Sequence, residues 1–245
     1  MQQTADQPDT LVRRVRHELK LRELTVARIE PLGAGFVAIT FTGEALADFT
    51  SLSFDDHVKF MFADADGAQV RRDYTPRRFS REARELVIEF ALHGDGKAVE
   101  WARRATVGQR ALVGGPRGSM ILPAALDWHL LAGDATALPA IARRLEELPA
   151  GSRALVRVHA APDDRRVFAG QADVDLRWFD TAEALAADMQ ALTLPGGRGF
   201  AWGGGEASLM ARVRHALNEK GVPREATRVS AYWKQGVAEH HEHLE

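Results

Sequence analysis

The chain has 245 residues, 45% of them hydrophobic and 27% charged, which is long enough for one large domain or two ordinary ones. Its formal net charge of −2 gives no overall positive field, so we expect neither nucleic acid nor an anionic membrane as a partner. Cysteine is absent, which excludes disulfides, thiol catalysis, thiolate zinc sites and cysteine-bound iron–sulfur clusters.

The first half of the chain is predicted to be rich in β-strands. Leu86, Ile88, Phe90 and Leu92 occupy alternate positions, as expected on one face of a half-buried strand. Several short strands in succession predict an antiparallel Greek-key β-barrel. The predicted strands are Leu24–Ile29, Gly35–Phe41, His57–Phe62, Val70–Tyr74, Glu85–Leu92 and Gln109–Val113, with one helix at about Ala98–Ala105.

The second half is predicted to alternate strands with helices. Leu209, Val213 and Leu217, for example, line one face of a helix. This alternation is typical of a parallel sheet covered by helices. The predicted strands are Trp128–Ala132, Ala154–His159, Val174–Phe179, Gly199–Trp202 and Arg228–Trp233, and the helices are one through Ile141, Leu145 and Leu148, one near Ala182–Leu192 and one at Glu206–Lys220.

The change from a strand-rich first half to alternating strands and helices predicts two domains. We place the boundary near Leu122-Pro123-Ala124, which gives a barrel domain of residues 11–122 and an α/β domain of residues 123–245 that includes a C-terminal tail. Ligands of open parallel sheets bind beyond the carboxyl ends of the strands. A cofactor held by the barrel could therefore meet a second ligand at that end of the sheet.

The segment Arg72–Phe79 lies between two strand-like runs and carries a cation, an aromatic ring and a hydroxyl. Alternate residues of a strand share one face. Arg72 can bind a phosphate through a charge-assisted pair, Tyr74 can pack on an isoalloxazine ring, and Thr75 can hydrogen-bond its polar edge. This combination suits a flavin nucleotide, and the alternative is an exposed arginine-rich strand end.

Three glycine-containing segments are candidates for nucleotide contacts. His93–Trp101 is a turn that opens a helix directly after a strand, where free N–H groups and the helix dipole favour an anion. Ala132–Ala140 links the first parallel strand to its helix, and a dinucleotide pyrophosphate would lie there, although the segment lacks the Gly-x-Gly-x-x-Gly fingerprint. We expect Trp202–Ala207 to be a second glycine-rich loop at the same sheet end. Ordinary turns and helix caps are the alternatives at all three.

Other chemistries receive little support from the sequence. The tail carries His240, His241 and His243, but a solvated chain end without a rigid framework is favoured over a metal site. No Gly-x-Ser-x-Gly motif indicates a nucleophilic triad, and we assign no catalytic side chain. Leu244-Glu245 could be a cloning remnant.

The chain shows no membrane or export signal. No stretch approaches the ~20 apolar residues of a spanning helix, and residues 1–6 lack the pattern of a signal peptide. We therefore expect a soluble cytoplasmic protein without membrane insertion, and a monomer, because no additional apolar helix or strand is apparent.

In chain order, these segments resemble the siderophore-interacting protein family, the FAD-dependent NAD(P)H ferric-siderophore reductases of the ferredoxin-reductase-like superfamily. The resemblance covers about residues 11–243. The matching pieces are His57-Val58-Lys59, Arg72-x-Tyr74-Thr75-Pro76-Arg77, His93-Gly94 with Trp101-Ala102, Gly115-Pro116-Arg117-Gly118, Gly133-Asp134-x-Thr136-Ala137-Leu138-Pro139-Ala140, Gly205-Glu206-Ala207 and Tyr232-Trp233-Lys234-x-Gly236.

The resemblance implies an FAD-binding barrel, NADPH or NADH as co-substrate, and a ferric siderophore as electron acceptor. Lys59 and Lys234 would form a basic pocket for the chelate. The implied cofactor contacts are Arg72, Tyr74, Thr75, His93, Lys97, Ala98 and Val99 for FAD, and Asp134, Thr136, Ala137 and Glu206 for the nicotinamide approach.

The sequence departs from the family pattern near the FAD pyrophosphate. Lys97-Ala98-Val99 stands where Pro-Ala-Ser/Thr is usual, so backbone N–H groups or Lys97 would replace the hydroxyl. Asp163-Asp164 could favour the ribose diol of NADH and Arg165-Arg166 the 2′-phosphate of NADPH, and we expect NADPH. Two alternatives stay open: a flavin reductase for a quinone or protein acceptor, and a siderophore- or nucleotide-binding protein without redox activity.

Overall fold

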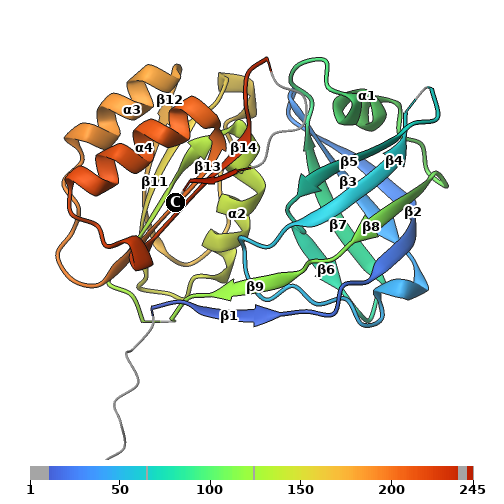
Figure 1. The fold of residues 1–245 in the computed structure, drawn as a ribbon, viewed down its shortest axis with the longest axis horizontal. Coiled ribbons are helices and arrows are strands. Elements are labelled where there is room, and N and C mark those ends of the chain that lie inside the picture. Colours follow the sequence, from blue (N-terminus) through green and yellow to red (C-terminus); the bar gives the residue numbers. More distant parts are fainter. Residues whose placement is uncertain (1–10, 65, 124, 237–241, 245) are drawn as a thin grey trace, which may run out of the picture.

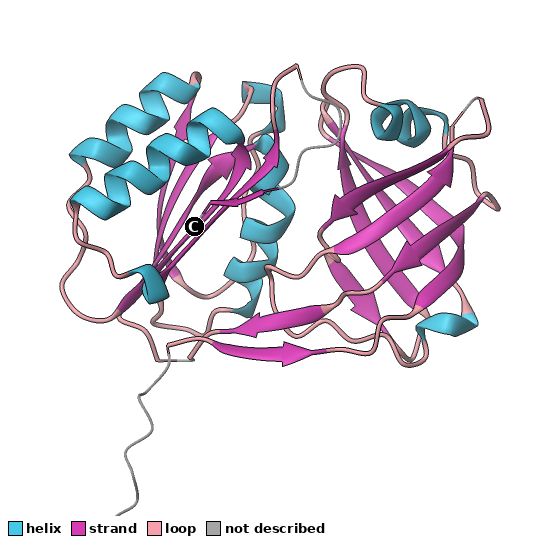
Figure 2. Ribbon diagram, in the orientation of Figure 1, coloured by secondary structure: helices cyan, strands magenta, loops and turns pink. Residues whose placement is uncertain are grey.

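The computed structural model describes residues 11–64, 66–123, 125–236 and 242–244. Two halves lie side by side, an antiparallel one from the first part of the chain and a largely parallel one from the second (Figure 1). Helix α2 (Leu138–Glu147) lies between them, while helices α3 (Ala182–Ala191) and α4 (Ala207–Glu219) cover the far face of the parallel sheet (Figure 2).

The antiparallel half is a seven-stranded sheet with the strand order β5-β4-β8-β2-β3-β7-β6. Its apolar residues alternate, so that one face of each strand enters a common core. Aromatic rings fill this core, and Trp101 of helix α1 (Lys97–Arg104) packs 4.6 Å from Phe60 between ring centroids. The strands are β2 Leu21–Leu32, β3 Phe36–Thr42, β4 Val58–Ala63, β5 Gln69–Tyr74, β6 Arg78–Ser80, β7 Glu85–Ala91 and β8 Arg110–Gly114.

The second half is a six-stranded sheet with the order β12-β11-β10-β13-β14-β15, parallel except where β15 meets β14. Because both faces are covered, its central strands are buried throughout, as in β10 and β13. The strands are β10 Trp128–Asp134, β11 Arg153–His159, β12 Asp173–Phe179, β13 Gly199–Glu206, β14 Thr227–Trp233 and β15 Glu242–Leu244.

The predicted fold class, an antiparallel barrel domain followed by a parallel α/β domain, is confirmed, and the predicted loop at Trp202–Ala207 is wrong. Strand β13 continues to Glu206, so Gly203–Gly205 belong to the sheet. Close packing requires the glycine at position 205, because a Cβ there would lie 2.6 Å from Asp134 Oδ2. A glycine run hides a strand from pattern analysis because it carries no apolar side chains.

The prediction also missed several short elements. Strands β1 (Arg13–Arg16) and β9 (Gly118–Ile121) pair in a separate two-stranded sheet beneath both halves (Figure 1). The 3-10 helices are η1 Glu44–Leu46, η2 Ala135–Ala137, η3 Pro162–Asp164 and η4 Arg224–Ala226. Within the described ranges, no helix is both long enough and apolar enough to cross a membrane.

Arginines connect the two halves. Arg143 of α2 donates from Nη1 to Ser51 Oγ and to the Pro76 carbonyl, both at 2.8 Å. Arg77 donates to both carboxylate oxygens of Glu146, at 2.7 and 2.6 Å, and its Nε lies 3.1 Å from Glu89 Oε1. Arg77 belongs to the basic cluster near the predicted flavin segment, and the structure uses it to hold the halves together.

Glu146 should make stability pH-dependent in acid. Arg77 above all, with Arg78, lowers the pKa of Glu146 from 4.5 to about 2. A carboxyl group whose pKa is lower in the folded state stabilises the fold above its unfolded pKa, and that contribution disappears as pH falls from about 4.5 towards 2. Urea unfolding of the parent and of Glu146→Gln should therefore show a free-energy difference that is largest at pH 7 and shrinks below pH 4.5. A difference that stays constant down to pH 3 would contradict this.

Candidate functional site

The carboxyl end of β5 and the start of α1 bring together the residues predicted to hold FAD in the barrel. Arg72 lies opposite Phe60 in the β5–β4 pairing and is partly buried. The Tyr74 ring packs 4.4 Å from Phe90 and 5.9 Å from Phe60, measured between centroids. Burial raises the pKa of Tyr74, so its phenol stays neutral. Thr75 follows directly and is also partly buried.

The first turn of α1 offers donors for an anion. Gly96 is the N-cap of α1, so no side chain there hydrogen-bonds the first free N–H groups of the helix. A Cβ built on Gly94 would meet no heavy atom within 4 Å. Lys97 donates to Asp64 Oδ2 at 2.5 Å. This bond raises the pKa of Lys97, and the nearby charge of Arg72 acts in the opposite direction, so the two cations share one neighbourhood.

This donor set fits the diphosphate of FAD. The turn before α1 presents backbone N–H groups without a competing cap, and Arg72 and Lys97 supply positive charge. Ala98 is buried and Val99 partly buried, so neither side chain provides a polar contact. In an FAD complex, backbone N–H groups and these cations would replace the hydroxyl missing at Val99.

His93 lies at the same end of the barrel but is engaged with the other half. Its Nε2 is 2.8 Å from Asp164 Oδ2, and Asp164 is only 2% exposed. Close by, Arg166 donates to Glu89 at 2.6 Å, and Arg165 bonds to Asp180. Three of the four residues predicted to distinguish NADH from NADPH therefore bind other protein groups, and two of them, Asp164 and Arg166, do so across the junction.

Asp134 ties three strand ends of the parallel sheet together. It ends β10 and caps η2, and its Oδ1 accepts hydrogen bonds from Thr136 N at 2.8 Å and Thr136 Oγ1 at 2.5 Å. Its Oδ2 accepts from Glu206 N at 2.6 Å, in β13, and from Trp233 Nε1 at 3.0 Å, in β14. Burial raises the pKa of Asp134, and these four donors oppose that shift.

Glu206 performs a similar role at the start of α4. Its Oε2 accepts from Ser208 N at 2.6 Å and Leu209 N at 3.2 Å. Burial raises the pKa of Glu206, but the bonds from Ser208 and its neighbours prevail and leave the pKa lowered. Thr136 is partly buried and Ala137 fully buried beneath the same backbone. The predicted nicotinamide residues therefore meet at one sheet end, mainly as the groups that fix its backbone.

The two predicted substrate lysines lie on either side of the junction. Lys59 of β4 donates to Asp73 of β5 at 2.7 Å. Lys234 follows β14, is exposed, and makes no ion pair with another residue in the described part of the chain. Burial raises the pKa of Tyr232, which lies two residues before Lys234. The carboxylates of Asp55 and Asp73 act in the same direction.

Sequence reasoning missed several residues that build this junction. Asp55 accepts from Trp202 Nε1 at 2.7 Å and from Arg228 Nε at 3.1 Å, although it lies in a barrel loop. No local pattern marks it, because both partners are distant in sequence. Trp233 is 41% exposed and donates to Asp134, and the sequence does carry a signal for it: a tryptophan beside a lysine at the end of a predicted strand.

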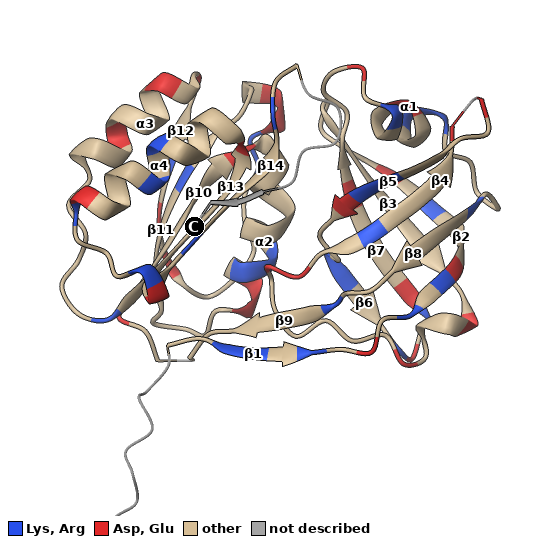
Figure 3. Cartoon of the chain, viewed as in Figure 1, with Lys and Arg blue, Asp and Glu red and all other residues tan. Residues whose placement is uncertain are grey.

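Charge is not segregated at the junction. Basic and acidic residues are interleaved over both halves (Figure 3). Among the described residues, no group of three or more His, Asp or Glu side chains is placed to hold a metal ion. The tail histidines His240 and His241 lie outside the described residues.

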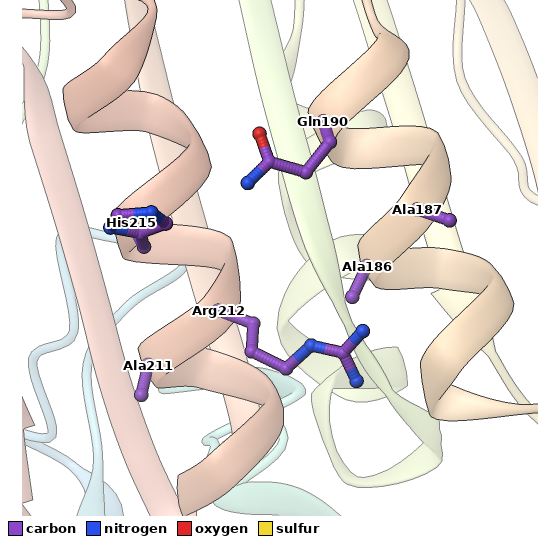
Figure 4. A pocket seen from close by; sticks show the side chains of 6 residues that line it. All are labelled: Ala186, Ala187, Gln190, Ala211, Arg212 and His215. Atoms are coloured by element: carbon purple, nitrogen blue, oxygen red, sulfur yellow. The ribbon is translucent and has the colours of Figure 1, made fainter.

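A groove of about 400 Å³ lies apart from all of these residues, between α3 and α4. Figure 4 shows Arg212 and His215 of α4 beside Ala186 and Gln190 of α3. This groove is on the sheet face away from the barrel, so it does not belong to the candidate site.

Comparison with known proteins places this architecture in context. The model of the siderophore-interacting FAD-binding domain matches residues 25–71 and 64–120, and that of the siderophore-interacting protein matches residues 126–236. The NADPH-dependent ferric-chelate reductase of Escherichia coli is 32% identical over 90% of this chain and 95% of its own length. Ferric vibriobactin reductase ViuB of Vibrio cholerae is 29% identical over 91% and 93%. A siderophore utilization protein from T. fusca matches with a TM-score of 0.85 and 31% identity, over 93% of this chain and 97% of that one.

Proposed function

Because the chain belongs to the siderophore-interacting protein family, we propose that it is a flavin-dependent reductase that passes electrons from NADPH through FAD to the iron of a ferric siderophore. One observation carries this proposal. The uncapped start of α1, near Arg72, Lys97 and Tyr74, follows His93, whose bond to Asp164 joins this end of the barrel to the loop beyond the carboxyl end of β11. Two nucleotides bound there would meet at their reactive ends.

On the barrel side, Arg72, Lys97 and the N–H groups of residues 97–99 would bind the FAD diphosphate. Tyr74, held against Phe90, would orient the isoalloxazine ring, and Thr75 would hydrogen-bond its polar edge. When bound, FAD supplies the redox chemistry that lets a two-electron donor reduce Fe(III) one electron at a time. His93 would contribute to the adenine side while it stays bonded to Asp164.

On the sheet side, Asp134 and Glu206 would act by positioning. Asp134 fixes the ends of β10, β13 and β14 relative to one another, and Glu206 fixes the first turn of α4. The backbone at Thr136 and Ala137 is therefore already ordered before the nicotinamide nucleotide arrives. A preordered site loses less conformational entropy on binding.

The lysines would attract the anionic chelate. Lys234 would supply most of the field, because Lys59 is already paired with Asp73. No protein ligand for the iron is needed, since Fe(II) binds hard oxygen donors less tightly than Fe(III) and reduction itself promotes release. The monomeric state and a cytoplasmic location stay predictions.

The function is tested with the FAD-loaded protein under anaerobic conditions. NADPH should bleach the yellow flavin absorbance, and ferric vibriobactin should restore it with formation of Fe(II). Lys234→Gln should raise KM for the ferric chelate about tenfold while the bleaching rate stays unchanged. A colourless protein that gains no flavin from added FAD would refute the proposal. So would a bleached flavin that a quinone reoxidises and ferric vibriobactin does not.

A further inference from the structure

A second hollow lies where the two halves join, far from the candidate site. It has a volume of about 240 Å³ and is bounded by the loop before β4, by β9 with the following Leu122-Pro123, and by the end of α2. Its lining mixes apolar and polar groups. The apolar side chains are Leu52, Met120, Leu122, Leu148 and Pro149, and the polar ones include Ser53, Glu147 and the cation Arg144.

Arg144 is partly buried and, unlike the buried arginines of this protein, forms no ion pair with a carboxylate among the described residues. Its Nη2 is 3.5 Å from His129 Nδ1, and its guanidinium carbon lies 5.1 Å from the centroid of the Phe54 ring. The Nε atom is buried without a hydrogen-bond partner among the described residues. The nearest acid, Glu147, is committed to Arg143 at 2.7 Å.

The contrast with the buried arginines is consistent across the molecule. Arg22, Arg77, Arg143 and Arg157 each form an ion pair with at least one carboxylate. A cation withdrawn from water without such a partner costs free energy, and this cost falls when an anion is supplied. At Arg144, which is partly buried, such an anion would come from outside the described protein groups.

His129 cannot neutralise Arg144. It is 1% exposed, and burial, assisted by the charge of Arg144, lowers its pKa to about 4. The ring is therefore neutral near pH 7, with Nδ1 facing the guanidinium and Nε2 without a partner among the described residues. It provides a polar wall behind Arg144 and adds no charge.

We propose that this hollow binds a small monocarboxylate with an apolar body, with Arg144 holding the carboxylate and Met120, Leu122 and Leu148 packing against the body. A phosphate is disfavoured, because its greater charge would meet a single cation, Arg144, with the carboxylate of Glu147 in the same lining. The site is separate from the reductase site. His129 is near the start of β10 and Asp134 ends it, five residues and about 17 Å further along the strand.

Occupation of this site should stabilise the junction of the halves, since its lining comes from both of them. The test uses the FAD-loaded full chain, with benzoate as the probe and benzamide as a neutral probe of the same shape. Calorimetric titration should show benzoate binding at least tenfold tighter than benzamide, and benzoate should raise the melting temperature. Equal affinity of the two probes would overturn the proposal without any variant.

Three variants locate the binding. Arg144→Gln should weaken benzoate binding about 10- to 100-fold. Leu52 lines the hollow at its rim and is 49% exposed. The carboxylate introduced by Leu52→Glu should compete with benzoate for Arg144 and abolish benzoate binding, although Arg144 itself is kept. Arg212→Gln, in the groove between α3 and α4, should leave binding unchanged. Loss of benzoate binding in Arg212→Gln would refute the site. Unchanged benzoate binding in both Arg144→Gln and Leu52→Glu would refute it as well.

Discussion

Arg72→Ala is expected to weaken FAD binding roughly 10- to 100-fold, the effect of losing a charge-assisted contact to phosphate. Arg72 shares its neighbourhood with Lys97 at the uncapped start of α1, and no side chain of Ala98 or Val99 can compensate. Val99 lacks a side-chain hydroxyl, so a larger share of the proposed diphosphate contact would fall on Arg72.

Arg71→Ala is the matched control. Arg71 precedes Arg72 on the same strand, is exposed, and pairs with Met61 on the opposite face. Titration of the FAD-free proteins with FAD, followed by quenching of flavin fluorescence, measures both variants. If Arg71→Ala and Arg72→Ala lose affinity equally, the contribution is general electrostatics, and the assignment of Arg72 to the diphosphate is wrong.

Asp134→Asn is expected to abolish measurable NADPH binding and to lower the unfolding free energy by about 3 kcal/mol. The carboxylate accepts four hydrogen bonds, and an amide places an NH₂ group against two of those donors. The ends of β10, β13 and β14 would then separate. FAD binding should persist, because the proposed FAD residues belong to the barrel.

Asp180→Asn provides the control at the same end of the sheet. Asp180 follows β12 and its side chain is 81% exposed, so its exchange should change unfolding and NADPH binding little. Urea unfolding of the FAD-free chain and NADPH titration give the two readouts. Unchanged NADPH affinity in Asp134→Asn would show that the Asp134 contacts serve stability alone.

The sequence predicted what depends on local patterns. Alternation revealed β7, and the segment Ala132–Ala140 does link the first parallel strand to its helix as predicted, with Asp134 at the end of β10 as the cap of η2. Two of the four donors to Asp134 could not be foreseen, because Glu206 N and Trp233 Nε1 reach it only after three strands assemble.

The sequence patterns could not predict the long-range ion pairs either. Arg77 looked like one more cation near a phosphate site, and only the docking of α2 brings Glu146 to it. For the same reason, Asp164 and Arg166 resembled nucleotide-selecting residues until the loop after β11 was seen to contact the barrel. Composition and periodicity carry no information about such partners.

The charges Arg166, Glu89, Arg77 and Glu146 alternate in one continuous chain that crosses from the loop after β11 through the barrel to α2. Pulling the halves apart would leave acids and bases of this chain unpaired, and all four side chains are at most a quarter exposed. The spacing between the two proposed nucleotide sites would therefore be set when the protein folds. Electron transfer, whose rate depends steeply on separation, would thus proceed over a gap that substrate binding does not have to close.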